Sequence, residues 1–298
     1  MKILIVKLSF VIFFVSASIP LRAQNRIIVT QSNLGKATIF ADGATSLDGK
    51  GYSYDRLDDV KTIIHYKTFL AFTDNPEEGL KDEMILQIGR RYSKYYSPLL
   101  HAADSAMQAG GRQTGFISKL FANANPVFIN DCFYTDLATG DLAFVCRFAT
   151  EDFEYTETPS SIDWRISQES KVICGYDCHK ATGSFRGRSY EVWYTEDIPV
   201  SAGPWKLRGL PGTILLASDS DRLCRFEAVS VTSASGAIEK PVYPYIKISR
   251  KEYRTLLQQY FKTPGRFTSM HMSRAPGIVI TPPAKETPFR GVVILEQD

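Results

Sequence analysis

The sequence predicts an α+β domain that is predominantly antiparallel β, with a curved sheet, open-barrel or sandwich-like, and a few helices. Three observations lead to this fold class. Apolar and polar residues alternate with period two in segments rich in β-branched and aromatic residues, helical patterns are rare, and strand follows strand along the chain. A doubly wound sheet would instead need a helix between successive strands.

Five segments carry the strand pattern and two carry a helical one. The expected strands are residues 60–72, 83–89, 180–195, 212–218 and 223–231. The first helical candidate, "SPLLHAADSAMQA", starts at Ser97, and the second, "SRKEYRTLLQQYF", has Ser249 as its N-cap and Glu252 completing a capping box. The stretch "DCFYTDLATGDLAFVCRF" predicts a hairpin that turns near residues 138–141.

The first 23 residues have the pattern of a secretory signal peptide (residues 1–23). Lys2 and Lys7 precede an apolar run that ends near Ile19, and Ala23 offers a small side chain at the cleavage point. The run is shorter than the roughly 20 apolar residues of a membrane-spanning helix, and no second run of that length follows. We therefore expect residues 24–298 to form one β-rich domain, exported to the periplasm or the extracellular side of the cell envelope, with no integral membrane span.

The charge of the exported part is balanced. The chain has 35 Lys and Arg and 32 Asp and Glu residues, and Lys2, Lys7 and Arg22 lie in the expected signal peptide, so the two counts become equal after its removal. Binding to nucleic acid depends largely on an excess of basic residues that neutralise phosphates. We therefore expect no nucleic-acid partner.

The stretch "GPWKLRGLPGTILL" concentrates glycine and proline ahead of an apolar run. Pro211 and Gly212 occupy the second and third positions of a potential type II turn, in which the glycine has positive φ. Gly203 and Gly209 are further positions that tolerate positive φ. The predicted structural turn comprises Gly209, Leu210, Pro211 and Gly212. We expect the next residues to leave this turn as a buried strand, so that the motif is architectural.

Residues 180–195, taken as one strand, place Val192 and four polar side chains on one face. The four are Arg186, Arg188, Tyr190 and Tyr194. Such a strand either lines a ligand cavity or carries its arginines at an exposed end, and exposure is the more usual state of arginine. These four residues are the candidate ligand-binding set.

Five cysteines follow the signal segment: Cys132, Cys146, Cys174, Cys178 and Cys224. Disulfides persist in oxidising compartments outside the cytosol. Cys132 and Cys146 stand almost symmetrically about the expected hairpin turn, so we expect a disulfide between them. Cys224 pairs with Cys174 or Cys178, and one cysteine stays unpaired.

Two short stretches contain soft metal ligands. One joins Cys174 and Cys178 to His179, and the other is Met270-His271-Met272. Neither has the spacing of a known metal site, and neighbouring residues of a strand point to opposite faces. We expect no metal and no other cofactor.

Four motifs follow one another between Cys178 and Leu215: "CHKAT", "FRGRSYEVWYT", "IPVSAGPW" and "GLPGTI". Together they resemble the GLPGLI family of exported proteins, known mostly from Bacteroidetes, whose biochemical function is not established. The upstream stretch "MILQIGRRYSKYYS" fits the family pattern as well, whereas Thr213 stands where the eponymous motif has leucine. The resemblance implies an envelope or periplasmic protein and carries over no catalytic residues.

Two classes of function follow from these observations. The chain has no G-x-S-x-G elbow, H-E-x-x-H helix, phosphate loop or dinucleotide fingerprint, so we assign no catalytic residue. The favoured function is a non-catalytic binding or chaperone-like module of the cell envelope, whose partner is an apolar or peptide ligand or an envelope protein. The alternative is a thiol-dependent, hydrolase-like envelope enzyme that uses Cys178 or Cys174 as its nucleophile.

Overall fold

Strands dominate the computed structural model of this chain. The structure describes residues 5–9, 27–31, 36–41, 53–98, 131–148, 151–242, 244–263, 266–267, 278–280, 285 and 295–296. Within them α3 (Arg250–Lys262) is the one helix described in full, and the remaining elements are strands. The expected helix that starts at Ser97 lies, from residue 99 onward, outside the described residues.

Twelve strands form one sheet. Its order is β11 (Arg165–Ile173), β12 (Tyr176–Phe185), β13 (Arg188–Thr195), β14 (Thr213–Asp219), β15 (Cys224–Ser233), β5 (Thr62–Phe72), β6 (Asn75–Ile88), β7 (Tyr92–Tyr96), β8 (Cys132–Asp136), β9 (Leu142–Phe148), β10 (Glu151–Glu157) and β17 (Ile246–Lys247). All neighbours are antiparallel except β10 and β17, which run parallel, so the sheet is mixed. The end strands β11 and β17 do not pair with each other, and the sheet is not closed into a barrel.

The predicted fold class is therefore wrong in two respects. The structure is mostly β-sheet rather than α+β with a few helices, and the large sheet, predicted to be antiparallel and either open-barrel or sandwich-like, is mixed and not closed into a barrel. Alternation along the chain indicates where single strands lie, but it cannot reveal which strands lie at the ends of the sheet or whether those ends meet.

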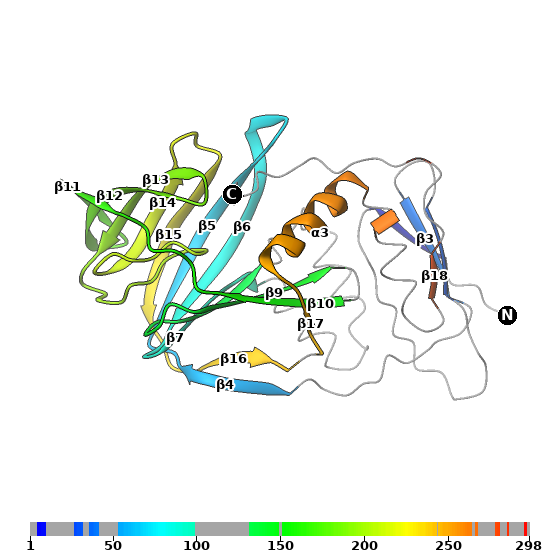
Figure 1. The fold of residues 1–298 in the computed structure, drawn as a ribbon, viewed down its shortest axis with the longest axis horizontal. Coiled ribbons are helices and arrows are strands. Elements are labelled where there is room, and N and C mark those ends of the chain that lie inside the picture. Colours follow the sequence, from blue (N-terminus) through cyan, green and yellow to red (C-terminus); the bar gives the residue numbers. More distant parts are fainter. Residues whose placement is uncertain are drawn as a thin grey trace.

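Two smaller sheets complete the described structure (Figure 1). One pairs β16 (Ala237–Pro241) with β4 (Tyr54–Asp59). The other has the order β1 (Ile5–Ser9), β3 (Lys36–Ala41), β2 (Ile27–Gln31) and β18 (Ile278–Ile280). Strand β1 lies in the segment predicted as a signal peptide, and export itself stays a prediction.

Four of the five expected strands are present as β5, β6, β14 and β15. The fifth, 180–195, is two strands joined by a two-residue turn at Arg186 and Gly187, whose φ angles are 51° and 80°. Positive φ at both central residues is the geometry of a tight hairpin turn that matches the twist of its strands. A turn of two residues leaves the alternation uninterrupted, which is why the pattern reads as one strand.

The hairpin and the second helix are confirmed. Strands β8 and β9 pair on either side of a turn in which Gly140 has a φ of 82°. Helix α3 begins with the predicted capping box, because the Ser249 side chain accepts from the Glu252 N–H at 3.2 Å and the Glu252 carboxylate accepts from the Ser249 N–H at 2.7 Å. Tyr253 then packs α3 onto the sheet, with its ring centroid 4.6 Å from that of Phe144.

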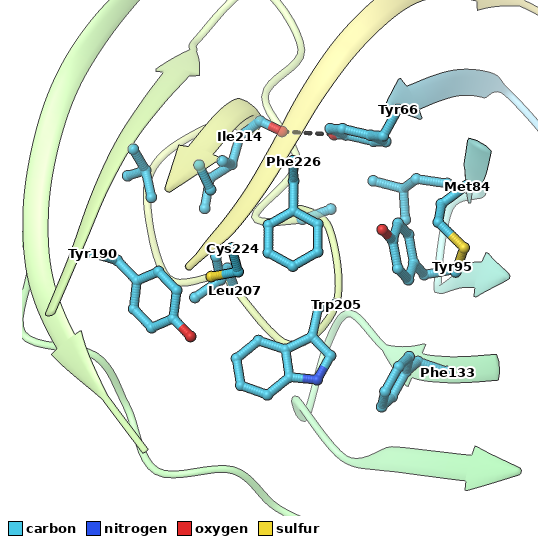
Figure 2. Packing of buried hydrophobic residues seen from close by; sticks show 14 of the residues in the cluster. Tyr66, Met84, Tyr95, Phe133, Tyr190, Trp205, Leu207, Ile214, Cys224 and Phe226 are labelled. Carbon is cyan, nitrogen blue, oxygen red and sulfur yellow. Dashed lines mark hydrogen bonds between the residues drawn. The ribbon is translucent and has the colours of Figure 1, made fainter. Parts of the chain in front are cut away.

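One main core fills the inner side of the large sheet, and part of it is drawn in Figure 2. Its largest fully buried side chains include Tyr66, Met84, Tyr190, Phe226 and Ile214. The Tyr66 hydroxyl donates to the Ile214 carbonyl at 2.6 Å and so ties β5 to β14, although β15 separates them in the sheet (Figure 2). Buried hydroxyls need such partners, because an unpaired one costs about 1 to 3 kcal/mol.

The segment between β13 and β14 (residues 196–212) is part of this core. Trp205, Leu207 and Leu210 are all buried, and Trp205 and Leu207 point into the cluster (Figure 2). Gly209 has positive φ, at 104°, but Gly212 does not, so the predicted type II turn with positive φ at Gly212 is wrong. Gly212 is needed for a different reason: a Cβ there would lie 2.0 Å from the Thr195 carbonyl oxygen.

Thr213 is fully buried, and its hydroxyl group is hydrogen-bonded. Two carbonyl oxygens share this donor, that of Val200 at 2.9 Å and that of Ile198 at 3.3 Å. A leucine at this position would leave both carbonyls without that donor. Thr213 thus closes the loop onto the start of β14.

We predict that Gly212→Ala destabilises the protein by about 3 kcal/mol, because the added methyl group meets backbone that cannot move without separating β13 from β14. Gly175→Ala is the matched control: its φ is +85° and nothing lies within 4 Å of the added atom, so only the cost of positive φ, on the order of 1 kcal/mol, applies. Urea denaturation of both variants measures the difference. Equal losses would contradict the close-approach argument.

Candidate functional site

The loop of residues 196–212 carries a lysine into the interior of the molecule. Lys206 is 3% exposed, and it follows Trp205, whose φ of 55° lies in the left-handed region. That conformation costs a non-glycine residue on the order of 1 to 2 kcal/mol. It is held by packing of the Trp205 ring against Phe185, at 5.6 Å between centroids, and by the Leu207 N–H, which donates to the Pro204 carbonyl at 3.1 Å.

Three groups accept hydrogen bonds from the buried ammonium group of Lys206. Lys206 Nζ donates to the carboxylates of Glu157 and Glu296, and to the Tyr155 hydroxyl oxygen at 2.9 Å. It also lies 5.2 Å from the centroid of the Tyr155 ring and 5.8 Å from that of Phe133. A buried ammonium needs such compensation, since desolvation costs several kcal/mol per ion.

Two arginines complete the arrangement. Arg186 Nη2 lies 2.8 Å from Glu157, and Arg250 Nη1 lies 2.7 Å from Glu296. We call the set Lys206, Arg186, Arg250, Glu157, Glu296 and Tyr155 the Lys206 cluster. It joins the loop, the end of β10, the turn between β12 and β13, the first turn of α3 and the segment at residue 296.

Burial and ion pairing act in opposite directions on the carboxylates. Burial alone would raise the pKa of Glu296, but Lys206 and Arg250 hold that pKa below its usual value. Nearby, burial raises the pKa of Asp131 to about 6, although the Tyr253 hydroxyl donates to it at 3.0 Å. Each glutamate of the cluster is held by two or more cations, so the cluster fastens segments of the chain together and leaves neither carboxylate free as a catalytic base.

A small hollow lies beside this cluster, lined by both apolar and polar side chains. The lining includes Tyr95, Phe133, Leu142, Trp205 and Lys206. It has room for about one water molecule. Within the described residues, therefore, this hollow is too small to enclose an apolar ligand.

The predicted ligand-binding residues separate into different environments. Arg186 belongs to the Lys206 cluster, whereas Arg188 is 7% exposed and pairs with Asp219 at 2.9 Å. Tyr190 is buried in the core, and the Tyr194 hydroxyl donates to Glu196 at 3.5 Å. The expectation of arginines at an exposed strand end is wrong, because both guanidinium groups pair with buried or half-buried carboxylates. A ligand-binding role for these residues stays a prediction.

Sequence reasoning missed Lys206, Glu157 and Glu296. The sequence feature that could have revealed this cluster is the lysine inside the apolar, turn-rich "GPWKL" stretch, because a buried lysine requires acidic partners. Its partners lie 49 and 90 residues away and belong to other elements. No local pattern links them to Lys206.

The predicted disulfide between Cys132 and Cys146 is absent. In the pairing of β8 with β9, Cys132 lies opposite Val145, and adjacent residues of a strand face opposite sides of a sheet. Cys132 accordingly packs with Tyr134 and Val145, while Cys146 packs in the main core. All five cysteines, Cys132, Cys146, Cys174, Cys178 and Cys224, are free thiols.

The thiols are not activated. Burial raises the pKa of Cys178 to about 11 and that of Cys224 to about 12, and burial also raises the pKa of the more exposed Cys174. Nucleophilic cysteines instead have lowered pKa values, because the thiolate is the reactive form. Cys178 is buried whereas His179 is exposed, as expected for opposite faces of a strand, so this histidine is not placed to activate it.

Metal ligands do not converge in the described part of the chain, where no group of three His, Cys, Asp or Glu side chains is arranged to hold an ion. Met270, His271 and Met272 lie outside the described residues.

None of the helices among the described residues is long and apolar enough to cross a membrane.

Strand β11 forms one end of the large sheet and has an open edge (Figure 1). It pairs with β12 on one side, and no other described strand pairs with its second side. Ile166 and Val172 are 55% and 66% exposed there. The N–H and C=O groups along such an edge are available to another extended segment.

Charged side chains and an irregular register flank this edge. Glu169 pairs with Lys180 at 3.1 Å, and Lys171 Nζ lies 3.8 Å from the centroid of the Trp193 ring. The register between β11 and β12 shifts between Ile166 and Ser170. Charges and bulges hinder indiscriminate pairing of sheet edges, so these features protect β11 against nonspecific extension of the sheet.

Comparisons with known proteins match part of this chain to one family model. The model of a family described as the N-terminal domain of N-glycanase peptide matches residues 147–222. Two solved structures of PNGF-II, in the P21 and C2 space groups, align with 67% of this chain at 16% and 15% identity and TM-scores of 0.47 and 0.45. This chain covers about a third of their length, 33% and 32%. No curated protein matches the chain.

We predict that Lys206→Met lowers the free energy of unfolding by about 3 kcal/mol at pH 7, because it leaves buried carboxylates undercompensated. The folded-state pKa of Glu296 is depressed, so ionic stabilisation is present above its unfolded pKa and is lost as the pH falls through its folded pKa. The difference between variant and parent should therefore persist from pH 7 down to about 4.5, the ordinary pKa of a glutamate, and shrink as the pH falls further in urea melts.

The control for this experiment is Lys180→Met. Lys180 also bridges two glutamates, but Glu169 and Glu191 are 60% and 46% exposed, and such pairs contribute at most about 1 kcal/mol. If the two variants lost the same stability, the Lys206 cluster would have no special structural role.

We also predict that iodoacetamide modifies Cys174 first in the native protein and more slowly than it modifies free cysteine, because the thiol pKa is raised. The four buried cysteines should react only after unfolding. Peptide mapping without reductant should find no crosslinked pair. A Cys132–Cys146 crosslink, or a thiol that reacts faster than free cysteine, would contradict the structure.

Proposed function

We propose that this chain is an exported, non-catalytic binding module of the cell envelope and that its ligand is an extended peptide segment. Export is supported by the basic, apolar and small-residue regions of the first 23 residues and by the resemblance to the exported GLPGLI proteins. The matching family model describes an N-terminal domain of N-glycanase peptide, and a binding role beside such an activity is compatible with a chain to which no catalytic residue is assigned.

The observation that carries the peptide proposal is the open edge of β11. An extended peptide can add to such an edge as a further strand, with backbone hydrogen bonds supplying affinity and side chains supplying selectivity. Ile166 and Val172, exposed on this strand, offer apolar contacts to the incoming segment. An apolar ligand enclosed in a cavity has less support, because the hollow beside Lys206 holds about one water molecule.

The thiol-enzyme alternative has no supporting observation among the described residues. Burial raises the pKa of both Cys174 and Cys178, and a nucleophilic cysteine needs a lowered pKa or an adjacent base. The binding proposal needs neither.

Val172→Asp should weaken peptide capture at least tenfold, because it places a charge on the edge where the peptide's apolar side chains would pack. The probe is an array of ten-residue synthetic peptides rich in valine, isoleucine and threonine, incubated with the full chain. The matched control is Val229→Asp on β15, where the parent side chain is 46% exposed but lies within the sheet. Failure of the parent to retain any peptide, or an equal loss in the control, would overturn the proposal.

A further inference from the structure

We infer that the open edge of β11 pairs with the same edge of a second copy of this chain, antiparallel and about a two-fold axis at Glu169. The inference rests on the proposed function in one respect, because both assign the addition of a strand to this edge. It adds the regulation of that site: a self-paired edge excludes the peptide until the two copies separate.

The backbone of β11 is prepared for such pairing at alternate residues. Cys174 and Gly175 form a two-residue turn between β11 and β12, with φ angles of 53° and 85°. In a hairpin closed by such a turn the two flanking residues, here Ile173 and Tyr176, exchange both backbone hydrogen bonds. The preceding residue, Val172, therefore directs its N–H and C=O groups to the open edge.

Ile166 presents its backbone at the same edge. It lies opposite Ala181 on β12. The hairpin of β12 and β13 also closes with a two-residue turn, so Phe185 hydrogen-bonds to β13, and so does Ala181, four residues earlier. Ile166 is thus left with its N–H and C=O groups on the outer side. Ile166 and Val172 can both pair through the backbone, and both side chains are exposed.

Self-complementarity selects the register. The antiparallel pairing that is centred on Glu169 places Ile166 opposite the second copy's Val172. The two-fold axis repeats this contact, so both exposed apolar side chains of each copy are covered at once. Apolar side chains that lie directly opposite each other stabilise a strand pair.

The irregularity of β11 favours a copy of itself over another strand. The step from Ile166 to Ser170 on β11 matches the shorter step from Ala181 to His179 on β12, so β11 carries extra residues there. A regular strand laid along the open edge would be thrown out of step at the same place. A second β11 carries the same extra residues, so the two strands stay in step on both sides of the axis.

The charges beside the axis complement one another. Glu169 is bound by Lys180 at 3.1 Å, and Lys171 lies over the Trp193 ring, so both belong to the face opposite to the two apolar side chains. Within the described residues Lys171 has no ion pair, because Glu191, whose charge acts on it, is bound by Lys180. The two copies of Glu169 meet at the axis, but each is neutralised by Lys180 and lies diagonally across from the second copy's Lys171, within reach of a long side chain.

The dimer is expected to be weak. One pair of edge strands is a small contact, and interfaces below about 1,200 Å² in total are typical of transient complexes. The two copies should therefore pair at high protein concentration and separate on dilution. Such a dimer leaves the edge accessible to a competing peptide.

Sedimentation velocity of the full chain tests the inference. The parent should be mainly monomeric at about 1 µM and mainly dimeric at about 300 µM. Val172→Asp and Ile166→Lys should each raise the dissociation constant of the dimer about tenfold or more, because each places a charge opposite an apolar side chain. Val229→Asp, at an exposed position of β15, is the matched control and should dimerise like the parent.

An equimolar mixture of the two edge variants tests the register. In a mixed pair the two substituted side chains lie opposite each other with opposite charges, and the remaining Ile166 and Val172 also meet. The mixture should therefore form dimers at concentrations where neither variant does. A parent that is monomeric at about 300 µM, edge variants that dimerise like the parent, a control that loses the dimer, or a mixture that stays monomeric would overturn the inference.

The result can be separated from that of the proposed function. A monomeric parent that retains peptides removes the second copy as partner and leaves the proposed function in place. A parent that dimerises as expected but retains no peptide at about 1 µM, where its edges are free, removes the peptide proposal and leaves the second copy.

Discussion

The fold depends on satisfying one buried ammonium group. Lys206 is 3% exposed, and its charge is acceptable only because Glu157, Glu296 and Tyr155 meet it from different segments. The loop of residues 196–212, β10 and the segment at residue 296 must therefore be in place together. This requirement turns a long connection between two adjacent strands into part of the core.

The same loop explains why glycine and proline concentrate in "GPWKLRGLPGTILL". Gly209 supplies a positive φ, while Gly212 lets the chain pass the Thr195 carbonyl at a distance no side chain permits. Thr213 then hydrogen-bonds to the Val200 carbonyl and begins β14. The motif is a packing device, and the exposed edge of β11 lies elsewhere in the sheet.

Local patterns predicted local structure well and distant relations poorly. The capping box of Ser249 and Glu252 and the hairpin around Gly140 depend on residues a few positions apart, and both are present. The partners of Lys206 and the strand order of the sheet depend on contacts between remote segments, which alternation does not encode. The Cys132–Cys146 prediction failed for a related reason: symmetry about a turn does not determine the register, and here the register puts the two side chains on opposite faces.

The account rests on the claim that the loop around Lys206 is a fixed part of the core. Native-state hydrogen exchange of the Leu207 amide, which donates to Pro204 at 3.1 Å, tests this claim directly. We predict that this amide exchanges only through global unfolding, with the same denaturant dependence as the buried amides of β14. Exchange through a local opening, insensitive to denaturant and much faster than that of β14, would contradict the account and mark the loop as a mobile recognition element.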